Sequence, residues 1–367
     1  MNPVLFDTLA CHDGHAIGVA TLNSAASLNA LTPAMITLLH AQLDLWRQDD
    51  KVVCVVLRGA GGKAFCAGGD VRALRQALID HPQPAPHPVA RDYFAREYAL
   101  DFRIHTYDKP LIAWGHGIVM GGGLGLLVGA SHRVLTPESR IAMPEITIGL
   151  YPDVGGSWFL PRMPARLGLF LALTGASLNA NDALFANLAD HILPSDGLDP
   201  LLERLTRHTW QNRDRYAEVS ALLNEWEAPP SAPSRLLQHF DTLSPLMRQG
   251  SLTSVTQAIA RAEFSDPWLL QAQQGLQQGC PTTAALCWAI FQRAPRMSLA
   301  EVLRMELTLS VNLCARPDFS EGVRALLVDK DRQPRWSRGA DQIDADWIDS
   351  LFASPWPADA HPLRALM

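Results

Sequence analysis

Three segments of the chain carry residues that could perform chemistry. In FCAGGD (Phe65–Asp70) and GIVMGGGLG (Gly117–Gly125), glycines lie between a β-like run and a helical pattern. Glycine turns of this kind can point backbone N–H groups into a cleft, and a helix N-terminus favours negative charge there. One such turn alone would be an ordinary tight turn, but two of them predict an oxyanion hole.

The third segment, MPEITIGLYPDVGG (Met143–Gly156), places two acids, Glu145 and Asp153, eight residues apart. Paired carboxylates in an apolar setting push their pKa values apart, so that one can act as base or nucleophile while the other binds or orients. The competing interpretation, two solvated loop acids, stays open on the sequence alone.

Other site chemistries are not indicated by the sequence. It contains neither the G-x-G-x-x-G nor the G-K-[ST] nucleotide signature, no G-x-S-x-G elbow, and no cysteine spacing typical of zinc. Cys66, beside the first glycines, is interpreted as a packing residue. We therefore expect no metal site and no cofactor.

Composition narrows the class of protein further. The 367 residues have a formal charge of −6, with 48% hydrophobic and 19% charged residues, which does not suggest a nucleic-acid-binding surface. The longest apolar run, 117–130, is short and glycine-rich for a membrane span. Six cysteines without a disulfide framework, and Asp7 in place of a basic leader, predict a cytoplasmic protein.

The elements that must position these residues alternate between strand and helix in the first half of the chain, which is typical of an α/β domain. A helix is expected from Pro33, with Thr32 as its N-cap, and the Pro/His-rich stretch 81–88 is expected to be a surface loop that exposes His81 and His87. Strands are expected at 16–22, 52–58, 111–114 and 141–143, and further helices from Val71 and over 89–107.

From about Leu198 the pattern becomes amphipathic and helical, with a linker expected at 227–233. We therefore divide the chain into an α/β core, 1–195, and a helical region, 196–367.

Taken together, these segments resemble the crotonase superfamily, also called the enoyl-CoA hydratase/isomerase family. The match extends to REYALDF, KPLIAWGHGIVMGGGLGL and, late in the chain, DFSEGVRALLVDKDRQPRW. The resemblance implies a crotonase-like (ClpP/crotonase) spiral of ββα units with a mostly helical C-terminal region. A helical stretch at about 195–280 is typical of the subgroup that hydrolyses short 3-hydroxyacyl-CoA thioesters.

The resemblance also implies roles for individual residues. Gly69 and Gly122 would donate the oxyanion-hole N–H groups, and Glu97, Glu145 and Asp153 would line the acyl pocket. Glu145 would attack the thioester or activate water, while Asp153 and Glu97 would accept a hydrogen bond from the 3-hydroxyl group. The hydratases carry a catalytic glutamate where this chain has Gly125, so water addition by paired glutamates is not expected.

An acyl-CoA is thus the expected partner, with Lys63 and Arg72 as candidate contacts for its phosphates. Two alternatives stay open: a double-bond isomerase with Glu145 as its only base, and an acyl-CoA-binding protein without activity. The superfamily often forms trimers or hexamers, which leaves a homo-oligomer open.

Overall fold

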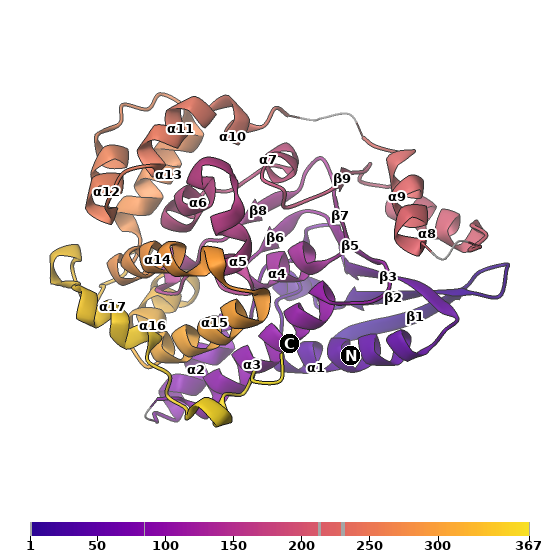
Figure 1. Ribbon diagram of the computed structural model, residues 1–367, viewed down its shortest axis with the longest axis horizontal. Helices are drawn as coiled ribbons and strands as arrows, with labels where there is room; N and C mark the ends of the chain where they lie inside the picture. The colour runs from indigo at the N-terminus through magenta and orange to yellow at the C-terminus, as the bar shows by residue number, and fades with distance from the viewer. Residues whose placement is uncertain (1, 84, 212–213, 229–231, 367) are drawn as a thin grey trace. The chain divides into compact units, whose positions relative to one another are not determined.

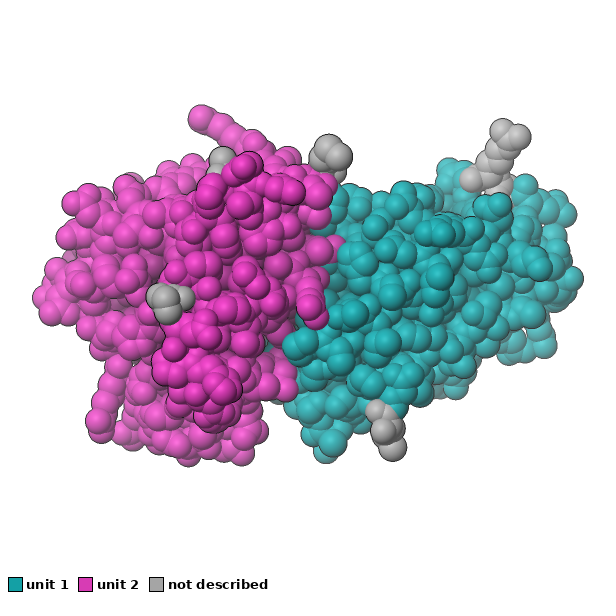
Figure 2. Space-filling view, turned by 90° about the horizontal axis from the view of Figure 1, so that it is seen from below, with its two compact units in different colours: residues 1–69, 100–141, 178–238 teal, residues 70–99, 142–177, 239–367 magenta. Residues whose placement is uncertain are grey.

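The structure is a computed structural model that describes the whole chain except residues 1, 84, 212–213, 229–231 and 367. The chain divides into two compact units that each combine several stretches of sequence (Figure 2). Unit 1 comprises residues 1–69, 100–141 and 178–238, and unit 2 comprises residues 70–99, 142–177 and 239–367.

Unit 1 is built on a six-stranded sheet in the order β1-β2-β3-β5-β7-β9 (Figure 1). The first two strands are antiparallel, and every later pair is parallel. The strands are β1 (Val4–Ala10), β2 (Ala16–Leu22), β3 (Val52–Gly59), β5 (Leu111–Gly115), β7 (His132–Leu135) and β9 (His191–Ile192).

The central strands are apolar along almost their whole length because helices cover the sheet. Seven of the eight β3 residues, VVCVVLRG, are buried, as expected of parallel strands that are covered on both faces. Ile17 and Val19 of β2 share a core with Leu201 and Val219 of two later helices. The helices of unit 1 are α1 (Pro33–Gln48), α4 (Gly122–Gly129), α7 (Ala180–Phe185), α8 (Leu198–Arg207), α9 (Arg215–Asn224) and α10 (Arg235–Gln238).

A second, three-stranded sheet positions the glycine turns. Its order is β4-β6-β8, and its strands are β4 (Ala64–Cys66), β6 (Ile118–Met120) and β8 (Arg140–Ala142). Strand β4 pairs in parallel with β6. One glycine turn follows each of these two paired strands, so the turns leave the sheet at the same edge.

Unit 2 is helical in its described secondary structure, apart from the end of β8. Helix α6 is buried at every position, and eleven of the sixteen residues of α15 are buried, so these two form its core. Its helices are α2 (Val71–Asp80), α5 (Gly156–Phe159), α6 (Leu167–Thr174), α11 (Phe240–Met247), α12 (Leu252–Arg261), α13 (Pro267–Gln278), α14 (Pro281–Arg293), α15 (Leu299–Cys314), α16 (Pro317–Val323) and α17 (Ala345–Phe352). Helix α3 (Pro88–His105) begins in unit 2 and ends in unit 1.

Most of the expected core elements are confirmed. Thr32 caps α1 by accepting a hydrogen bond from the Met35 N–H at 3.3 Å, and strands lie at 16–22, 52–59 and 111–115. The exposure expected of His87 is wrong, because its side chain is buried and its Nε2 lies 2.8 Å from the His81 carbonyl oxygen. The expected linker at 227–233 falls partly outside the described residues.

The α/β class with a mostly helical C-terminal region is confirmed. The proposed boundary at residue 195 stays a prediction, since the compact units interleave three stretches of sequence each. Among the described residues, no helix combines the length and the apolar character needed to cross a bilayer.

Candidate functional site

The first glycine turn, in unit 1, leaves the Gly69 N–H available. Gly68 has a φ of +106°, a conformation open to glycine at little cost, and its carbonyl accepts a hydrogen bond from the Leu31 N–H at 2.8 Å. Gly69 pairs with Leu31 in a parallel bridge. In a parallel bridge of this register the amides of residues 31 and 70 donate, so the Gly69 N–H has no partner in the bridge.

The second glycine turn brings Gly122 to the same place. Gly122 is the first residue of α4, so its N–H has no acceptor within the helix. A Cβ on Gly68 would lie 3.7 Å from the Gly122 nitrogen, and a Cβ on Gly123 would lie only 2.3 Å from the Cys66 carbonyl oxygen. The two turns are therefore in direct contact, with backbone donors from both, as an oxyanion hole requires.

A hollow of about 320 Å³ in unit 1 lies beside β4. Its walls are residues 25, 26, 28, 29 and 60–64, and they include the exposed Lys63. Arg72, the second candidate phosphate contact, is an exposed residue of α2 in unit 2. Only Lys63 of the two is thus placed against a described cavity.

Unit 2 holds the three candidate acids, and all of them are buried. Glu97 lies on α3, Glu145 begins the short 3-10 helix η2 (Glu145–Ile148), and Asp153 lies in the loop before α5. Their exposed fractions are 3%, 6% and 5%. The interpretation as solvated loop acids is therefore wrong for Glu145 and Asp153.

The burial of these acids raises their pKa values. For Glu145 and Glu97, burial is the largest cause of the raised pKa, and the nearby Asp153 charge raises both pKa values further. The pKa of Asp153 itself is raised to about 6 by burial, although a hydrogen bond from Tyr98 opposes the shift. Among the described residues, no arginine, lysine or histidine forms an ion pair with any of the three. With a pKa of about 6, Asp153 can hold or release a proton near neutral pH, and Glu97 and Glu145 hold a proton more firmly than ordinary glutamates do.

The three acids differ in their hydrogen-bond partners. The Tyr98 hydroxyl donates to Asp153 Oδ2 at 2.6 Å, and burial keeps the pKa of Tyr98 well above its usual value. Within the described part of the chain, by contrast, Glu97 Oε1 and Glu145 Oε2 are buried without a hydrogen-bond partner. Buried acceptors left in this state are costly, and a ligand hydroxyl or a water can supply the missing donor.

Sequence reasoning missed a further buried acid whose pKa depends on Asp153: Glu306 of α15, which is 0% exposed. Burial, and then the charge of Asp153, raises its pKa to about 8, while the N–H groups of Gly155 and Ser157 lower it. One signal was available in the sequence: Glu306 is a lone acid on the apolar face of the helix in MELTLSV. A charged residue on such a face is rarely buried without a specific partner.

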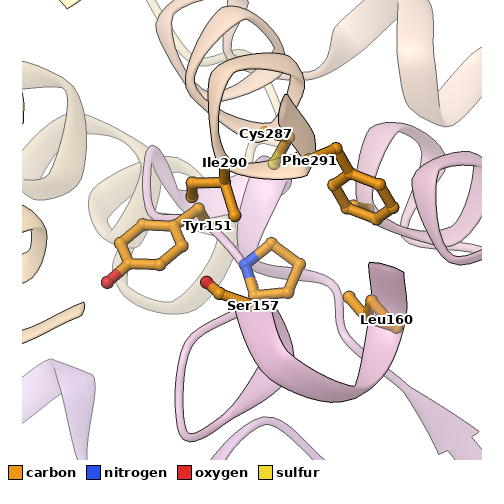
Figure 3. Close-up of a pocket in the computed structure, with 8 residues that line it drawn as sticks. Tyr151, Ser157, Leu160, Cys287, Ile290 and Phe291 are labelled. Carbon is orange, nitrogen blue, oxygen red and sulfur yellow. The ribbon is translucent and has the colours of Figure 1, made fainter. Parts of the chain in front are cut away.

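A small cavity of about 10 Å³ lies behind the loop that carries Asp153. Tyr151 of the loop and Ser157 of α5 face Cys287, Ile290 and Phe291 of α14 across it (Figure 3). A space of this size is at the lower limit for one water molecule. It is too small for an acyl group, so α14 packs closely against this side of the loop.

The remaining chemical candidates have structural roles. Cys66 is fully buried in β4, as expected of a packing residue. His116 Nε2 lies 2.7 Å from the Gly61 carbonyl oxygen, and His132 contacts Ser131 and Ser220. No group of three or more His, Cys, Asp or Glu side chains among the described residues is arranged to hold a metal ion.

Comparison with known proteins places the chain in a family. The profile of the family described as enoyl-CoA hydratase/isomerase matches residues 17–352. A solved structure described as an enoyl-CoA hydratase from Rhodobacter sphaeroides is 33% identical, with a TM-score of 0.83, and 96% of this chain and 98% of that chain are covered. A carnitinyl-CoA dehydratase from Mycobacterium thermoresistibile is 31% identical, with a TM-score of 0.85 and coverage of 99% and 98%. The chain belongs to the enoyl-CoA hydratase/isomerase family, and its crotonase-like fold is confirmed.

Within this family, the chain is similar to curated relatives that share the name 3-hydroxyisobutyryl-CoA hydrolase, mitochondrial. The protein from Xenopus tropicalis is 39% identical over 339 residues, which cover 92% of this chain and 86% of the relative. The human protein is 37% identical over 320 residues, which cover 87% and 81%. At these coverages, the alignments extend into the helical stretch at about 195–280, which the resemblance associates with the hydrolase subgroup.

Proposed function

We propose that the protein hydrolyses the thioester of 3-hydroxyisobutyryl-CoA, and of the related 3-hydroxypropionyl-CoA, to the free acid and CoA. The observation that carries the proposal is the match over about nine-tenths of the chain to relatives named for this reaction. The buried acids of unit 2 support it, because they offer a nucleophile or base together with acceptors for a hydroxyl group. Valine degradation is the pathway that such an activity would serve.

In this proposal the Gly69 and Gly122 N–H groups stabilise the thioester oxygen as it becomes negative. Each donor of an oxyanion hole is worth about 2.7–4 kcal/mol of transition-state stabilisation. Backbone donors suit this task because they are fixed by the turn and need no reorganisation during the reaction. The expected roles of both glycines rest on the contact between their two turns.

Glu145 supplies the attack. As nucleophile, its carboxylate oxygen adds to the carbonyl carbon, the C–S bond breaks, CoA leaves as a thiolate that takes up a proton, and water then hydrolyses the mixed anhydride. As base, it instead removes a proton from the water that attacks the carbonyl carbon. In this second role, the raised pKa makes the ionised Glu145 carboxylate a stronger base than an ordinary glutamate.

Glu97 and Asp153 recognise the 3-hydroxyl group. The unpartnered Glu97 Oε1 can accept a hydrogen bond from the hydroxyl group. Asp153, already held by Tyr98, can accept a hydrogen bond from the same group or orient the water. An ester without the hydroxyl group leaves these buried acceptors unpaired, which is the strongest basis for rejection of a close analogue. Selectivity for 3-hydroxy esters follows.

The remaining parts of the proposal concern partners and location. Lys63 and Arg72 contact CoA phosphates, and the reaction uses no cofactor beyond the CoA of the substrate. Six free, buried cysteines suit a reducing compartment such as the cytoplasm, whereas the names of the vertebrate relatives place those proteins in mitochondria. Cell fractionation tests the location, and sedimentation tests whether a homo-oligomer forms.

The experiment that tests the activity measures release of free thiol from three CoA esters: 3-hydroxyisobutyryl-CoA, isobutyryl-CoA and an enoyl-CoA. We expect fast release from the hydroxy ester alone. A change in enoyl absorbance without thiol would instead favour the isomerase, and tight binding of all three esters without turnover would favour the acyl-CoA-binding protein.

A further inference from the structure

Glu306 reaches from α15 to the loop that carries Asp153. Its Oε2 accepts a hydrogen bond from the Gly155 N–H at 2.8 Å, and its Oε1 accepts one from the Ser157 N–H at 2.9 Å. These amides are at the start of α5, where Gly155, the N-cap, has no side chain that could satisfy them. Glu306 therefore holds this turn with both of its oxygens, from a helix about 150 residues further along the chain.

The turn that Glu306 holds has a conformation that the loop does not favour by itself. Val154, directly after Asp153, has a φ of +50°, and Gly155 has a φ of +85°. A β-branched residue at positive φ is a true outlier, and it persists only where the surroundings hold it. The two N–H groups that donate to Glu306 belong to Gly155 and Ser157, directly after Val154, so these hydrogen bonds are placed to hold the Val154 conformation.

A second connection runs from α15 to the Asp153 carboxylate. Ser310, one turn after Glu306, has its Oγ 2.7 Å from the Tyr98 hydroxyl oxygen, and Tyr98 donates to Asp153 Oδ2. Tyr151 donates to the Glu306 carbonyl oxygen at 2.8 Å and has its hydroxyl oxygen 3.1 Å from Ser310 Oγ. Helix α15 thus fixes Asp153 on both sides: its backbone through Glu306 and its carboxylate through Ser310 and Tyr98.

We propose that Glu306 is a positioning residue that holds the Asp153 turn in the conformation needed to recognise the substrate's 3-hydroxyl group. This rests on the proposed function, in which Asp153 accepts that hydroxyl. Glu306 does not touch the substrate: it acts through the backbone of residues 155–157. Its loss lets the strained turn relax, which moves the Asp153 carboxylate and removes the advantage of the hydroxy ester.

The test compares Glu306→Gln with Glu263→Gln, which makes the same carboxyl-to-amide replacement at an exposed position of unit 2. The amide of the E306Q variant keeps one carbonyl oxygen but turns an NH₂ group toward one of the two backbone N–H groups, so that hydrogen bond is lost. The readout is the ratio of kcat/KM for 3-hydroxyisobutyryl-CoA to that for isobutyryl-CoA. We expect E306Q to lower the ratio about tenfold or more and E263Q to leave it unchanged.

The ratio separates positioning from general damage. An equal loss on both esters, or an unchanged ratio in folded E306Q, would overturn the proposal. If E306Q does not fold, Glu306→Asp tests the same two hydrogen bonds, because it keeps the carboxyl group but withdraws it by one methylene: a lowered ratio supports the proposal and an unchanged ratio overturns it.

Failure of the proposed function would be visible separately, as an absence of thiol release in the wild type. The affinities of the same variants for the two esters, measured by calorimetry, then decide about Glu306. The inference is supported if the wild type binds the hydroxy ester more tightly than isobutyryl-CoA and E306Q does not. It is contradicted if E306Q keeps this preference, or if the wild type has none.

Discussion

The glycine turns of unit 1 and the buried acids of unit 2 are built in opposite ways. In unit 1 the candidate functional groups are backbone N–H donors, which carry no titratable charge and are positioned by close approach of main chain to main chain. In unit 2 they are side-chain acceptors, taken from α3, η2, a loop and α15, and burial raises their pKa values.

This difference determines how each region can fail. A backbone donor is lost only when the main chain changes, so the glycine region depends on space and conformation. A buried acid is lost by a one-atom change in its side chain, and it also makes the folded state sensitive to pH. Substitutions in unit 1 should therefore act through geometry, and substitutions in unit 2 through charge.

The largest effect is expected for Glu145→Gln. This change keeps the shape of the side chain but removes the nucleophile or base, so kcat should fall by about 10²–10⁴-fold. Binding of 3-hydroxyisobutyryl-CoA, measured by calorimetry, should change little. A wild-type rate of thiol release would exclude Glu145 from the mechanism, and the acids of unit 2 would then have to be reassigned.

Gly122→Pro tests the backbone donors. Proline is tolerated at the first position of a helix but has no N–H, so this variant removes the donor and no side-chain group. We expect kcat to fall by about 10²–10³-fold, the cost of one oxyanion-hole donor.

Gly123→Ala is the matched control for this comparison, because it keeps every N–H but places a Cβ 2.3 Å from the Cys66 oxygen. We expect it to lower the urea midpoint rather than to act on kcat alone. Full activity in G122P would remove this N–H from the mechanism.

The two regions also differ in how far the sequence predicts them. Glycine motifs are local: FCAGGD and GIVMGGGLG each contain a strand end, a turn and the following residues, and the helix after the second begins at Gly122 as the pattern indicates. Glu145 and Asp153 share one segment, and their residue types suggested a site, but burial had to be observed because a loop acid is more often solvated.

Glu306 and Tyr98 could not be assigned from local patterns. Their hydrogen bonds join residues separated by about 150 and 55 positions, and no periodicity encodes which helix packs behind which loop. The short strands β4 and β6, of three residues each, were missed for a related reason. Their pairing, rather than their composition, makes them strands.

Asp153→Asn tests the pH sensitivity expected of the buried acids in unit 2. Folding raises the pKa of Asp153 from 3.8 to about 6, so between these values the folded state binds more protons and the wild type loses stability as pH rises. At about 1.4 kcal/mol per pKa unit, the cost reaches about 3 kcal/mol above pH 6.

The amide introduced by D153N does not titrate, so the stability of this variant relative to the wild type should increase between pH 5 and 7.5 by about half of that amount. Urea unfolding at both values measures the change. Gly122→Pro should show no such dependence, because no titratable group changes, and equal pH profiles for D153N and wild type would contradict the raised pKa.

The smallest effect is expected at Val154. This strained residue lies between Asp153, which accepts a hydrogen bond from Tyr98, and Gly155, which donates one to Glu306. At ordinary positions glycine is less stable than alanine by about 0.5–1 kcal/mol, because it loses more backbone entropy on folding. At a φ of +50° the order should reverse, since a left-handed conformation costs a residue with a Cβ about 1–2 kcal/mol.

Both V154G and V154A lose the buried valine side chain, so their difference in stability isolates the backbone effect. We expect V154G to be the more stable by about 1 kcal/mol in urea unfolding. If V154A were instead the more stable variant, the turn would carry no backbone strain, and Glu306 would not be needed to hold it in this conformation.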